Sequence, residues 1–579
     1  MQDQKNLVIA IVLSVVILLG FQMLFPGPSP PPPEDTSAGT ETFADGRADI
    51  PSVPAFDDGQ PGVVAQTDAP ENAPRDDNPR LPIGAAEHGR VIGSVALVGG
   101  RIDDLTLADY RETVDPESPQ IRLLAPPGTA NPYFAEFGWA ADEREAVGST
   151  PGPQTEWSTT DSRLSPGSPI TLTWDNGEGL HFSRKIAIDE NFMFAVTQSV
   201  ANRSNAPVTL HAYGRISRTD EPTTLGFYIL HEGPLGVFNG TLKEVDYSDL
   251  RETPTIEQST TGGWIGITDK FWLAALVPDQ QKIANTRFHF SNRGGRDKFQ
   301  VDYLLEPVVI PVGGSADVTN RLFAGAKEVA LLDEYAEQLG IINFDLSVDF
   351  GWFFYLTKPL FYVLHSFYGW FGNFGLAILG LTVIIKLFFF PLANKSYTAM
   401  SKLKTLQPQM MELREIYSDD KQKLNAEVMA LYKREKANPM AGCLPILVQI
   451  PVFFALYKVL FVSIEMRHAP FYGWISDLSA PDPTNLFNLF GLIPFTPPDF
   501  LAIGLWPLAM GLTMFLQQKL NPAPPDPMQA RIMMMLPLIF VFLFATFPAG
   551  LVLYWTWNNV LSIAQQWLIM RRVTAKMKS

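Results

Sequence analysis

The sequence predicts an α+β membrane protein: a β-sandwich domain outside the membrane, joined to six membrane-crossing helices with a helical hairpin on the cytoplasmic side. The two parts of the chain differ in charge, since residues 1–345 carry 25 Lys and Arg against 48 Asp and Glu, and residues 346–579 carry 19 against 12. They also differ in the pattern of apolar residues. The second part contains long apolar runs, and the first contains short β-branched and aromatic segments. Such asymmetry is typical of membrane or nucleic-acid proteins, and the apolar runs select the membrane. No nucleic-acid module is recognisable, so no direct nucleic-acid readout is expected.

Residues 1–25 are predicted to form an N-terminal transmembrane anchor. Leu7–Phe25 supply 19 nearly uninterrupted apolar positions, close to the roughly 20 that a helix needs to cross the hydrocarbon. A cleaved signal peptide is the alternative, but a proline tract follows the run where a small-residue cleavage site would stand. Residues 26–80 are rich in Pro, Gly and Asp, and we expect a disordered tether.

Residues 81–345 are predicted to be a β-sandwich domain. Short segments such as Ile170–Trp174, Phe192–Val200 and Val301–Leu305 are rich in β-branched and aromatic residues and are bounded by Gly, Pro, Asn and Asp. The single cysteine, Cys443, excludes a disulfide within the chain. Five of the seven histidines lie in this domain without a second ligand at a recognised spacing, so no metal site is expected; they are His88, His181, His211, His231 and His289.

Residues 346–371 are predicted to form a helix in the outer membrane interface, because their aromatic run is interrupted by Lys358, Pro359 and His365. Residues 372–570 are predicted to cross the membrane five times. The predicted spans are Gly372–Leu392, Ala441–Val462, Leu501–Lys519, Ile532–Thr546 and Ala549–Met570.

Orientation follows from the positions of Lys and Arg. The loop 393–440 carries nine of them and the short tail 571–579 carries four, whereas the loop 465–500 carries only Arg467. Both termini are therefore predicted to be cytoplasmic and the β domain to lie outside. A disulfide-free outer domain fits the periplasm of a bacterium with two membranes, which predicts the bacterial inner membrane as the location.

The loop 393–440 is predicted to be an antiparallel helical hairpin. Apolar residues recur at spacings of three and four on both sides of Ser418–Asp420, and Asn438–Pro439 ends the second helix. The apolar positions are explained by packing of the two helices. Candidate contacts for a nascent chain or a ribosome are the basic residues Lys402, Lys404, Arg414, Lys421, Lys423, Lys433 and Arg434.

Lys386 is the first candidate functional residue, because it is the fifteenth of 21 residues in the predicted span Gly372–Leu392. An ammonium at that depth costs kilocalories unless it is hydrated or paired. Two interpretations stay open: a functional lysine that faces water, or a lysine that snorkels to the inner interface.

Other spans supply polar residues. Thr382 lies one helical turn before Lys386, and Gln449 lies between two prolines. In the last span Trp555, Asn559, Ser562 and Gln566 form one helical stripe. Such residues form either a hydrated groove or hydrogen-bonded contacts between helices.

Four stretches carry a resemblance to a known family: YTAMSKLKTLQPQ from Tyr397, DDKQKLNAEVMALYKREKANPMAGCLPILVQIP from Asp419, SDLSAPDP from Ser476 and FPAGLVLY from Phe547. With them, residues 346–579 resemble the YidC family of membrane protein insertases. The anchor, tether and β domain resemble its Gram-negative branch, whose β domain is similar to a sugar-epimerase supersandwich. The resemblance implies a protein that inserts and helps fold new inner-membrane proteins through a hydrated groove bearing a cation, alone or with the Sec translocon.

Carried over by position, the resemblance places the groove cation at Lys386, where many members have arginine. It places client-contacting residues near Thr382, Gln449, Gln517, Tyr554 and Trp555, and the stripe adds Asn559. The implied partners are nascent membrane proteins, SecYEG and SecDF, the signal-recognition-particle receptor and the lipid bilayer; the short tail makes ribosome docking weak. The resemblance implies no enzymatic activity, cofactor or metal, and the chain has no G-x-x-x-x-G-K-[ST] phosphate loop.

Two other classes remain as alternatives. A transporter would be expected to show paired intramembrane charges or repeats, and the sequence shows one such cation and no repeat. A membrane-anchored sugar enzyme would need an acid–base pair in residues 81–340, which the sequence leaves open.

Overall fold

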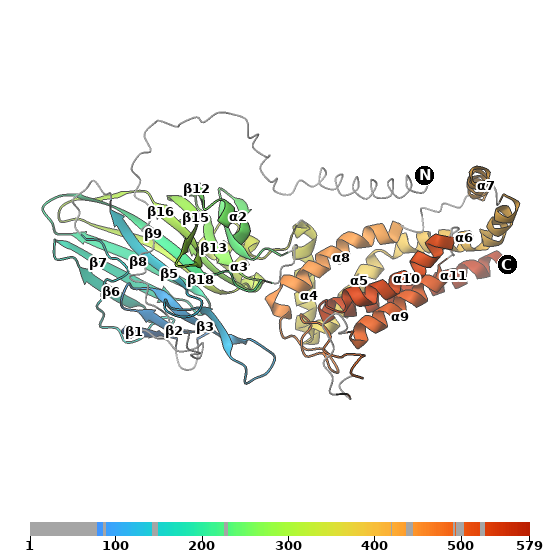
Figure 1. Ribbon diagram of the computed structural model, residues 1–579, viewed down its shortest axis with the longest axis horizontal. Coiled ribbons are helices and arrows are strands. Elements are labelled where there is room, and N and C mark those ends of the chain that lie inside the picture. Colours follow the sequence, from blue (N-terminus) through green and yellow to red (C-terminus); the bar gives the residue numbers. More distant parts are fainter. Residues whose placement is uncertain are drawn as a thin grey trace, which may run out of the picture.

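The computed structural model has a β-sandwich at one end and a set of helices at the other (Figure 1). The structure describes residues 78–84, 89–141, 149–224, 230–351, 353–417, 420–435, 444–489, 493, 503–521 and 527–578. The predicted anchor, 1–25, and all but the last three residues of the predicted tether, 26–80, lie outside the described residues.

Two sheets with antiparallel strand pairing form the β domain. The ten-stranded sheet has the order β1-β2-β3-β5-β9-β16-β15-β12, with β4 beside β3 and β17 beside β9. Its strands are β1 (Arg80–Ile83), β2 (Val91–Ala96), β3 (Ile102–Arg111), β4 (Gln120–Leu124), β5 (Tyr133–Ala141), β9 (Val208–Thr219), β12 (Thr255–Thr261), β15 (Ile283–Arg293), β16 (Arg296–Leu305) and β17 (Val308–Ile310). The eight-stranded sheet, in spatial order, consists of β11 (Thr241–Glu244), β10 (Gly233–Phe238), β13 (Trp264–Thr268), β14 (Trp272–Val277), β18 (Ser315–Ala326), β8 (Met193–Asn202), β7 (Leu180–Ile188) and β6 (Ile170–Asp175).

The strands form where apolar and polar residues alternate. In β8, Phe194, Val196, Gln198 and Val200 are buried while the alternate residues between them are partly exposed, so one face of the strand enters the core. The three segments that the sequence analysis named as strands lie in β6, β8 and β16, and the β-sandwich prediction is confirmed.

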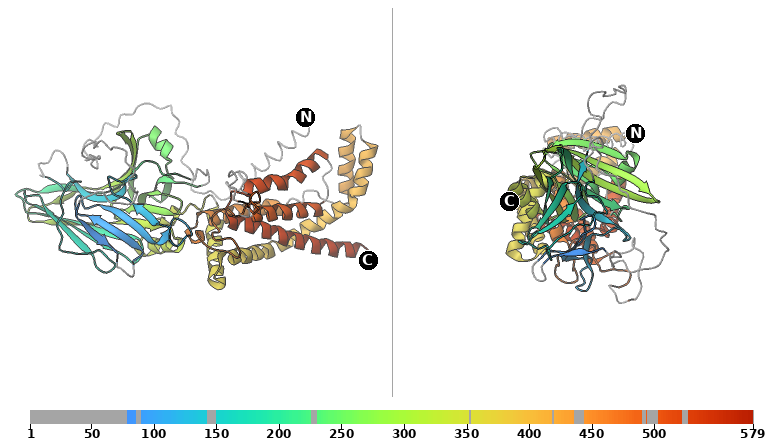
Figure 2. Two further views of the ribbon diagram at one scale, coloured as in Figure 1. Left: turned by 60° about the horizontal axis from the view of Figure 1, so that its bottom comes forward. Right: turned by 90° about the vertical axis from the view of Figure 1, so that its left-hand side faces the viewer.

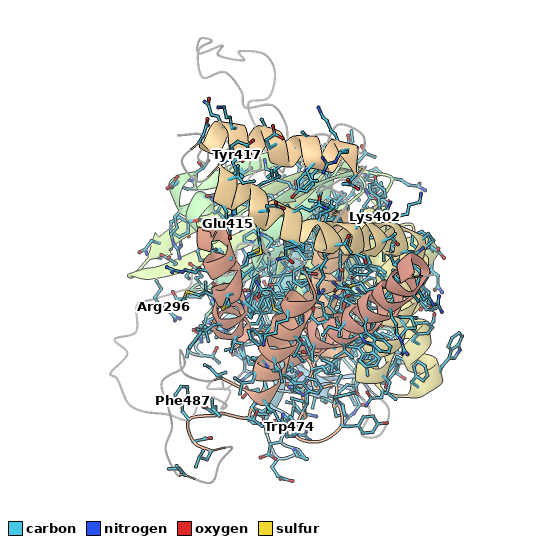
Figure 3. All side chains as sticks on the ribbon, turned by 90° about the vertical axis from the view of Figure 1, so that its right-hand side faces the viewer. Arg296, Lys402, Glu415, Tyr417, Trp474 and Phe487 are labelled. Atoms are coloured by element: carbon cyan, nitrogen blue, oxygen red, sulfur yellow. The ribbon has the colours of Figure 1, made fainter. Side chains whose placement is uncertain are left out.

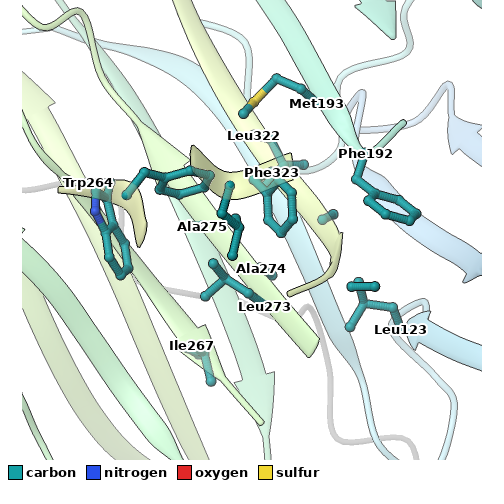
Figure 4. Close-up of a cluster of buried hydrophobic side chains, with 14 of the residues drawn as sticks. Leu123, Phe192, Met193, Trp264, Ile267, Leu273, Ala274, Ala275, Leu322 and Phe323 are labelled. Atoms are coloured by element: carbon teal, nitrogen blue, oxygen red, sulfur yellow. The ribbon is translucent and has the colours of Figure 1, made fainter. Parts of the chain in front are cut away.

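An aromatic cluster of the core lies on the face of the eight-stranded sheet that α3 (Val329–Leu339) and η1 (Phe344–Ser347) cover. Phe323 of β18 packs edge-on against Phe192, with ring centroids 6.1 Å apart, and against Phe344, at 5.4 Å. Trp264 closes the same cluster from β13, 5.6 Å from Phe344 (Figure 4). Aromatic rings thus fasten α3 and η1 to the sheet of a domain that has no disulfide.

Ten helices occur in the described part of the chain, with two short 3-10 turns, η1 (Phe344–Ser347) and η3 (Ile464–Met466). The helices are α2 (Tyr247–Glu252), α3 (Val329–Leu339), α4 (Phe354–Phe371), α5 (Phe374–Phe388), α6 (Phe390–Ile416), α7 (Lys421–Arg434), α8 (Leu444–Val462), α9 (Leu505–Leu520), α10 (Pro527–Phe544) and α11 (Ala549–Lys578).

Helix α4 occupies most of the predicted interfacial segment, 346–371. It runs across the direction of α8, α9 and α11 at the end of the helices nearest the β domain (Figures 1 and 2). Phe361 and Leu364 are buried, whereas Tyr355 and Trp370 are 71% and 76% exposed. An exposed aromatic face suits the headgroup region of a bilayer.

The predicted span Gly372–Leu392 is divided at Phe389. Asn373 caps the N-terminus of α5 by accepting a hydrogen bond from Leu376, and α5 ends at Phe388. Helix α6 then begins with Pro391 in its first turn, where proline is tolerated. Among the described residues no single helix is long and apolar enough for a span, but α5 and α6 together qualify, with a 67° bend between them.

The last two helices extend beyond their predicted bounds. Helix α10 begins at Pro527 instead of Ile532, and its 18 residues reach about 27 Å. Helix α11 continues through the basic tail to Lys578, so most of 571–579 is helical.

The β domain contacts the helices through the C-terminal end of α8 and the residues that follow it. The Lys458 ammonium donates to a carboxylate oxygen of Asp349 at 2.8 Å. Glu465, in η3, accepts a hydrogen bond from the backbone N–H of Val329 at 3.0 Å, and Arg467 donates to the backbone oxygen of Arg111 at 2.6 Å. We call these contacts the joint. They connect strands and helices that lie far apart in the sequence.

Candidate functional site

Lys386 lies in the last turn of α5, and its side chain reaches α11. The ammonium donates a hydrogen bond to the Ser562 hydroxyl at 2.7 Å. Lys386 is partly buried, and no carboxylate of the described residues lies within 4 Å of its ammonium. The arrangement places a cation on an apolar helix with a neutral partner.

Ser562 links this cation to the rest of α11. Its hydroxyl donates to the backbone oxygen of Asn558 at 2.7 Å and accepts from Lys386, and the Tyr397 hydroxyl of α6 lies close to it. Thr382, one turn before Lys386, is fully buried and donates to the backbone oxygen of Ile378 at 2.7 Å. The Thr382 hydroxyl is therefore used within its own helix.

Two further polar side chains of α11 bond to α9. Asn559 donates to the Thr513 hydroxyl at 3.2 Å. Gln566, which is fully buried, donates to the side-chain oxygen of Asn521, the residue after α9, at 3.0 Å. We call Asn559, Ser562 and Gln566 the polar seam. Its members join α11 to α5 and α9, which agrees with the interpretation of the stripe as contacts between helices.

Trp555, at the outer end of the predicted stripe, packs among aromatic rings. Its ring centroid lies 4.6 Å from that of Phe453 on α8 and 4.9 Å from that of Phe544 on α10. The adjacent Tyr554 is buried, and its hydroxyl lies close to the Gln449 side chain of α8. Tyr554 and Trp555 thus connect α11 to α8 and α10.

The structure brings the predicted site residues together in three groups. Lys386 and Thr382 lie on α5 beside Ser562, Asn559 lies against α9, and Gln449, Tyr554 and Trp555 meet where α8 contacts α11. Gln517 is half-buried on α9 and makes no hydrogen bond with another described residue.

Sequence reasoning missed Thr513, Tyr397 and Asn521. Thr513 could have been found, because it lies four residues before Gln517 on the same helical face.

The predicted hairpin residues lie on α6 and α7, at the end of the molecule away from the β domain (Figures 1 and 3). Tyr432 of α7 contacts the Met410 sulfur of α6 at 3.4 Å, so the two helices pack together. Arg414 is half-buried, and the Lys421 side chain lies outside the described residues. The exposed basic residues are Lys402, Lys404, Lys423, Lys433 and Arg434.

Comparison with known proteins gives the same family for both parts of the chain. The model of the 60Kd inner membrane protein family matches residues 366–576, and the model of the YidC periplasmic domain matches residues 86–363. A membrane protein insertase YidC of Bradyrhizobium diazoefficiens is 48% identical, with 100% of this chain and 98% of the relative covered. That of Granulibacter bethesdensis is 50% identical, with 98% of each covered.

Among solved structures, an active YidC insertase with the first transmembrane domain resolved covers 84% of this chain and 94% of its own, at 17% identity and a TM-score of 0.35. That score is too low to support an argument about the fold. The sequence matches are sufficient without it, since they extend over the whole chain at about half identity. The chain therefore belongs to the YidC family of membrane protein insertases.

Proposed function

We propose that this insertase moves the acidic tail of a client across the membrane by presenting it with the Lys386 cation in a hydrated groove, while the client's apolar segment passes into lipid. The observation that carries the proposal is the Lys386 ammonium on an apolar helix, with a serine hydroxyl as its hydrogen-bond partner. Burial of the client's own apolar segment drives the step.

The weak partner of Lys386 favours this role. The hydrogen bond from the Lys386 ammonium to the neutral Ser562 hydroxyl contributes about 1.5–3 kcal/mol net. A carboxylate about 4 Å from an ammonium gains about 4 kcal/mol at an effective dielectric constant of 20. An arriving carboxylate would therefore displace Ser562, which a permanent ion pair would prevent.

The α6–α7 hairpin is proposed to make the first contact with the emerging client. Its exposed lysines and arginine are joined by exposed apolar residues, since Met411, Ile416 and Met429 are 59%, 62% and 52% exposed. A surface that combines cations with flexible methionines suits varied apolar segments. We propose three further partners on the family resemblance alone. They are the Sec translocon, the ribosome and the signal-recognition-particle receptor.

The test is Lys386→Glu in cells depleted of their own insertase. Two clients are compared, identical except that one has an acidic translocated tail and the other a neutral one. Reversing the charge replaces attraction by repulsion, and because about 1.4 kcal/mol is a tenfold change, insertion of the acidic client should fall at least about tenfold. The neutral client should change by less than about twofold.

Two controls accompany this variant. Lys386→Arg keeps the charge and should retain insertion, and Lys519→Glu reverses an exposed lysine at the end of α9. Full insertion of the acidic client by Lys386→Glu would refute the attraction mechanism. An equal loss for both clients would refute it too, because the lysine would then act only in stability.

A further inference from the structure

A small basic hollow lies on the β domain, far in sequence from the membrane helices. Three neighbouring strands, β9, β16 and β15, line it with Ser217, Gln300, Lys298, His289, Ser291 and Arg293, and Arg287 closes one side. Cross-strand pairing places Ser217 opposite Gln300, and Gln300 opposite His289. Because paired residues in a sheet point to the same side, these polar groups share one face.

The same face carries a ladder of alternating charge next to the hollow. Pairing places Glu136, Arg215, Asp302 and Arg287 side by side on four strands. Arg215 bonds Glu136 at 2.9 Å, and Arg287 bonds Asp302 at 3.0 Å. These four charges cancel, so Asp302 does not oppose an anion in the hollow. The exposed Glu257 of β12 lies opposite Arg287 at the end of the ladder.

Positive charge therefore dominates the hollow itself. Arg293 and Lys298 add two cations, although residues 1–345 as a whole carry 48 acidic against 25 basic residues. The pKa of His289 lies below its ordinary value, because of burial first and of the Arg287 charge second. Burial also lowers the pKa of Lys298. An anion in the site would oppose both effects, because a nearby negative charge favours the protonated forms of His289 and Lys298.

We propose that this hollow binds a single small oxyanion group, either a tetrahedral phosphate or sulfate or a planar carboxylate. Two serines offer neutral hydrogen bonds, and the Gln300 amide, which donates one N–H to Asp302, offers its second. Arg293 and Lys298 offer charge-assisted hydrogen bonds. Among the residues that the structure describes, no aromatic or aliphatic side chain lines the hollow, which argues against an apolar ligand. The β15–β16 hairpin, with Arg296 near its tip, projects to the side of the helices, where a periplasmic ligand could reach it (Figure 3).

The test measures binding of sodium phosphate, sulfate and acetate to the full chain in lipid nanodiscs by calorimetry, at one ionic strength set with chloride. We expect saturable binding of one ion per chain. Tighter phosphate and sulfate binding would assign the tetrahedral group, and tighter or equal acetate binding would assign the carboxylate. Absence of saturable binding by all three above the chloride background would overturn the proposal.

A double variant, Arg293→Gln with Lys298→Gln, locates the site and leaves the Arg287–Asp302 pair in place. It should weaken binding at least tenfold. The matched control is Lys185→Gln, an exposed lysine on β7 of the other sheet, which should leave binding unchanged. An equal loss in the control, or none in the double variant, would show that the ion binds elsewhere or only through the net charge of the domain.

Discussion

Glu465 provides a pH-dependent test of the joint between the β domain and α8. One carboxylate oxygen accepts the hydrogen bond from Val329 at the start of α3, while the other is buried without a partner. Burial raises the pKa of Glu465 from its ordinary value of 4.5 to about 7, and the nearby Glu328 adds to the rise. Since a tenfold change in proton affinity corresponds to about 1.4 kcal/mol, the charged form opposes docking by about 3 kcal/mol.

The direction of the pH dependence follows from the linkage between proton binding and docking. Because the pKa is higher in the docked state than in the open state, the docked state binds the proton more tightly. The full penalty is present above pH 7, and it is relieved as the pH falls towards 4.5. The joint should therefore be tighter in acid, the reverse of an ordinary carboxylate with a lowered pKa.

Hydrogen exchange of the Val329 amide measures the opening of the joint. After correction for the intrinsic exchange rate, its protection should fall about 40-fold between pH 5 and pH 7. Glu465→Gln should abolish this dependence, because the amide has the shape of the protonated carboxyl, and at pH 8 it should exceed the wild-type protection. The control Glu337→Gln, on the exposed face of α3, should keep the pH dependence of the wild type. If the protection of the wild type does not change with pH, or that of Glu465→Gln still does, the reasoning is wrong.

Two further predictions concern packing. Gly325→Ala would place a Cβ 2.2 Å from the ring of Phe192, which should lower the stability of the β domain by about 1–3 kcal/mol; thermal denaturation should show no such loss for Gly152→Ala, whose Cβ has open space. Trp555→Ala removes a ring from the α8–α10–α11 contact, and because lipid solvates the exposed apolar surface, its cost should be below the roughly 3–5 kcal/mol of a soluble core. Thermal midpoints in nanodiscs should fall clearly less for Trp555→Phe, and an equal fall would indicate that the indole N–H, not the ring, carries the effect.

Much of the fold follows from short-range pattern. The strand β8 alternates in polarity and the hairpin helices repeat at spacings of three and four, so both could be predicted without knowing their neighbours. Strand order could not, because β5 pairs with β9 and β8 pairs with β18 across long stretches of chain. The bend at Phe389 was missed for a related reason. The apolar run continues through Leu392, and hydrophobicity alone does not reveal that a new helix begins next to Pro391.

The sequence names candidate site residues, but it does not predict which residues they contact. Lys386 stands out because a charge in an apolar run is costly. Its bond to Ser562 crosses 176 positions of sequence and depends on the rotation of two helices. The joint was missed for the same reason, since Glu465 and Arg467 appear in the sequence as ordinary residues of a short loop.

The polar seam limits how far the site must rearrange when a client binds. Three hydrogen bonds hold α11 against α5 and α9, those of Ser562, Asn559 and Gln566. The neutral bonds of Asn559 and Gln566 contribute about 1 kcal/mol net each, and the charge-assisted bond from Lys386 to Ser562 about 1.5–3 kcal/mol. A client carboxylate that takes the Lys386 ammonium breaks only the first. Because the other two remain, α11 keeps its rotation while Lys386 changes partner. Ser562→Ala should therefore leave the helices in place and free the ammonium, whereas Asn559→Ala should loosen α11 from α9 without touching the cation.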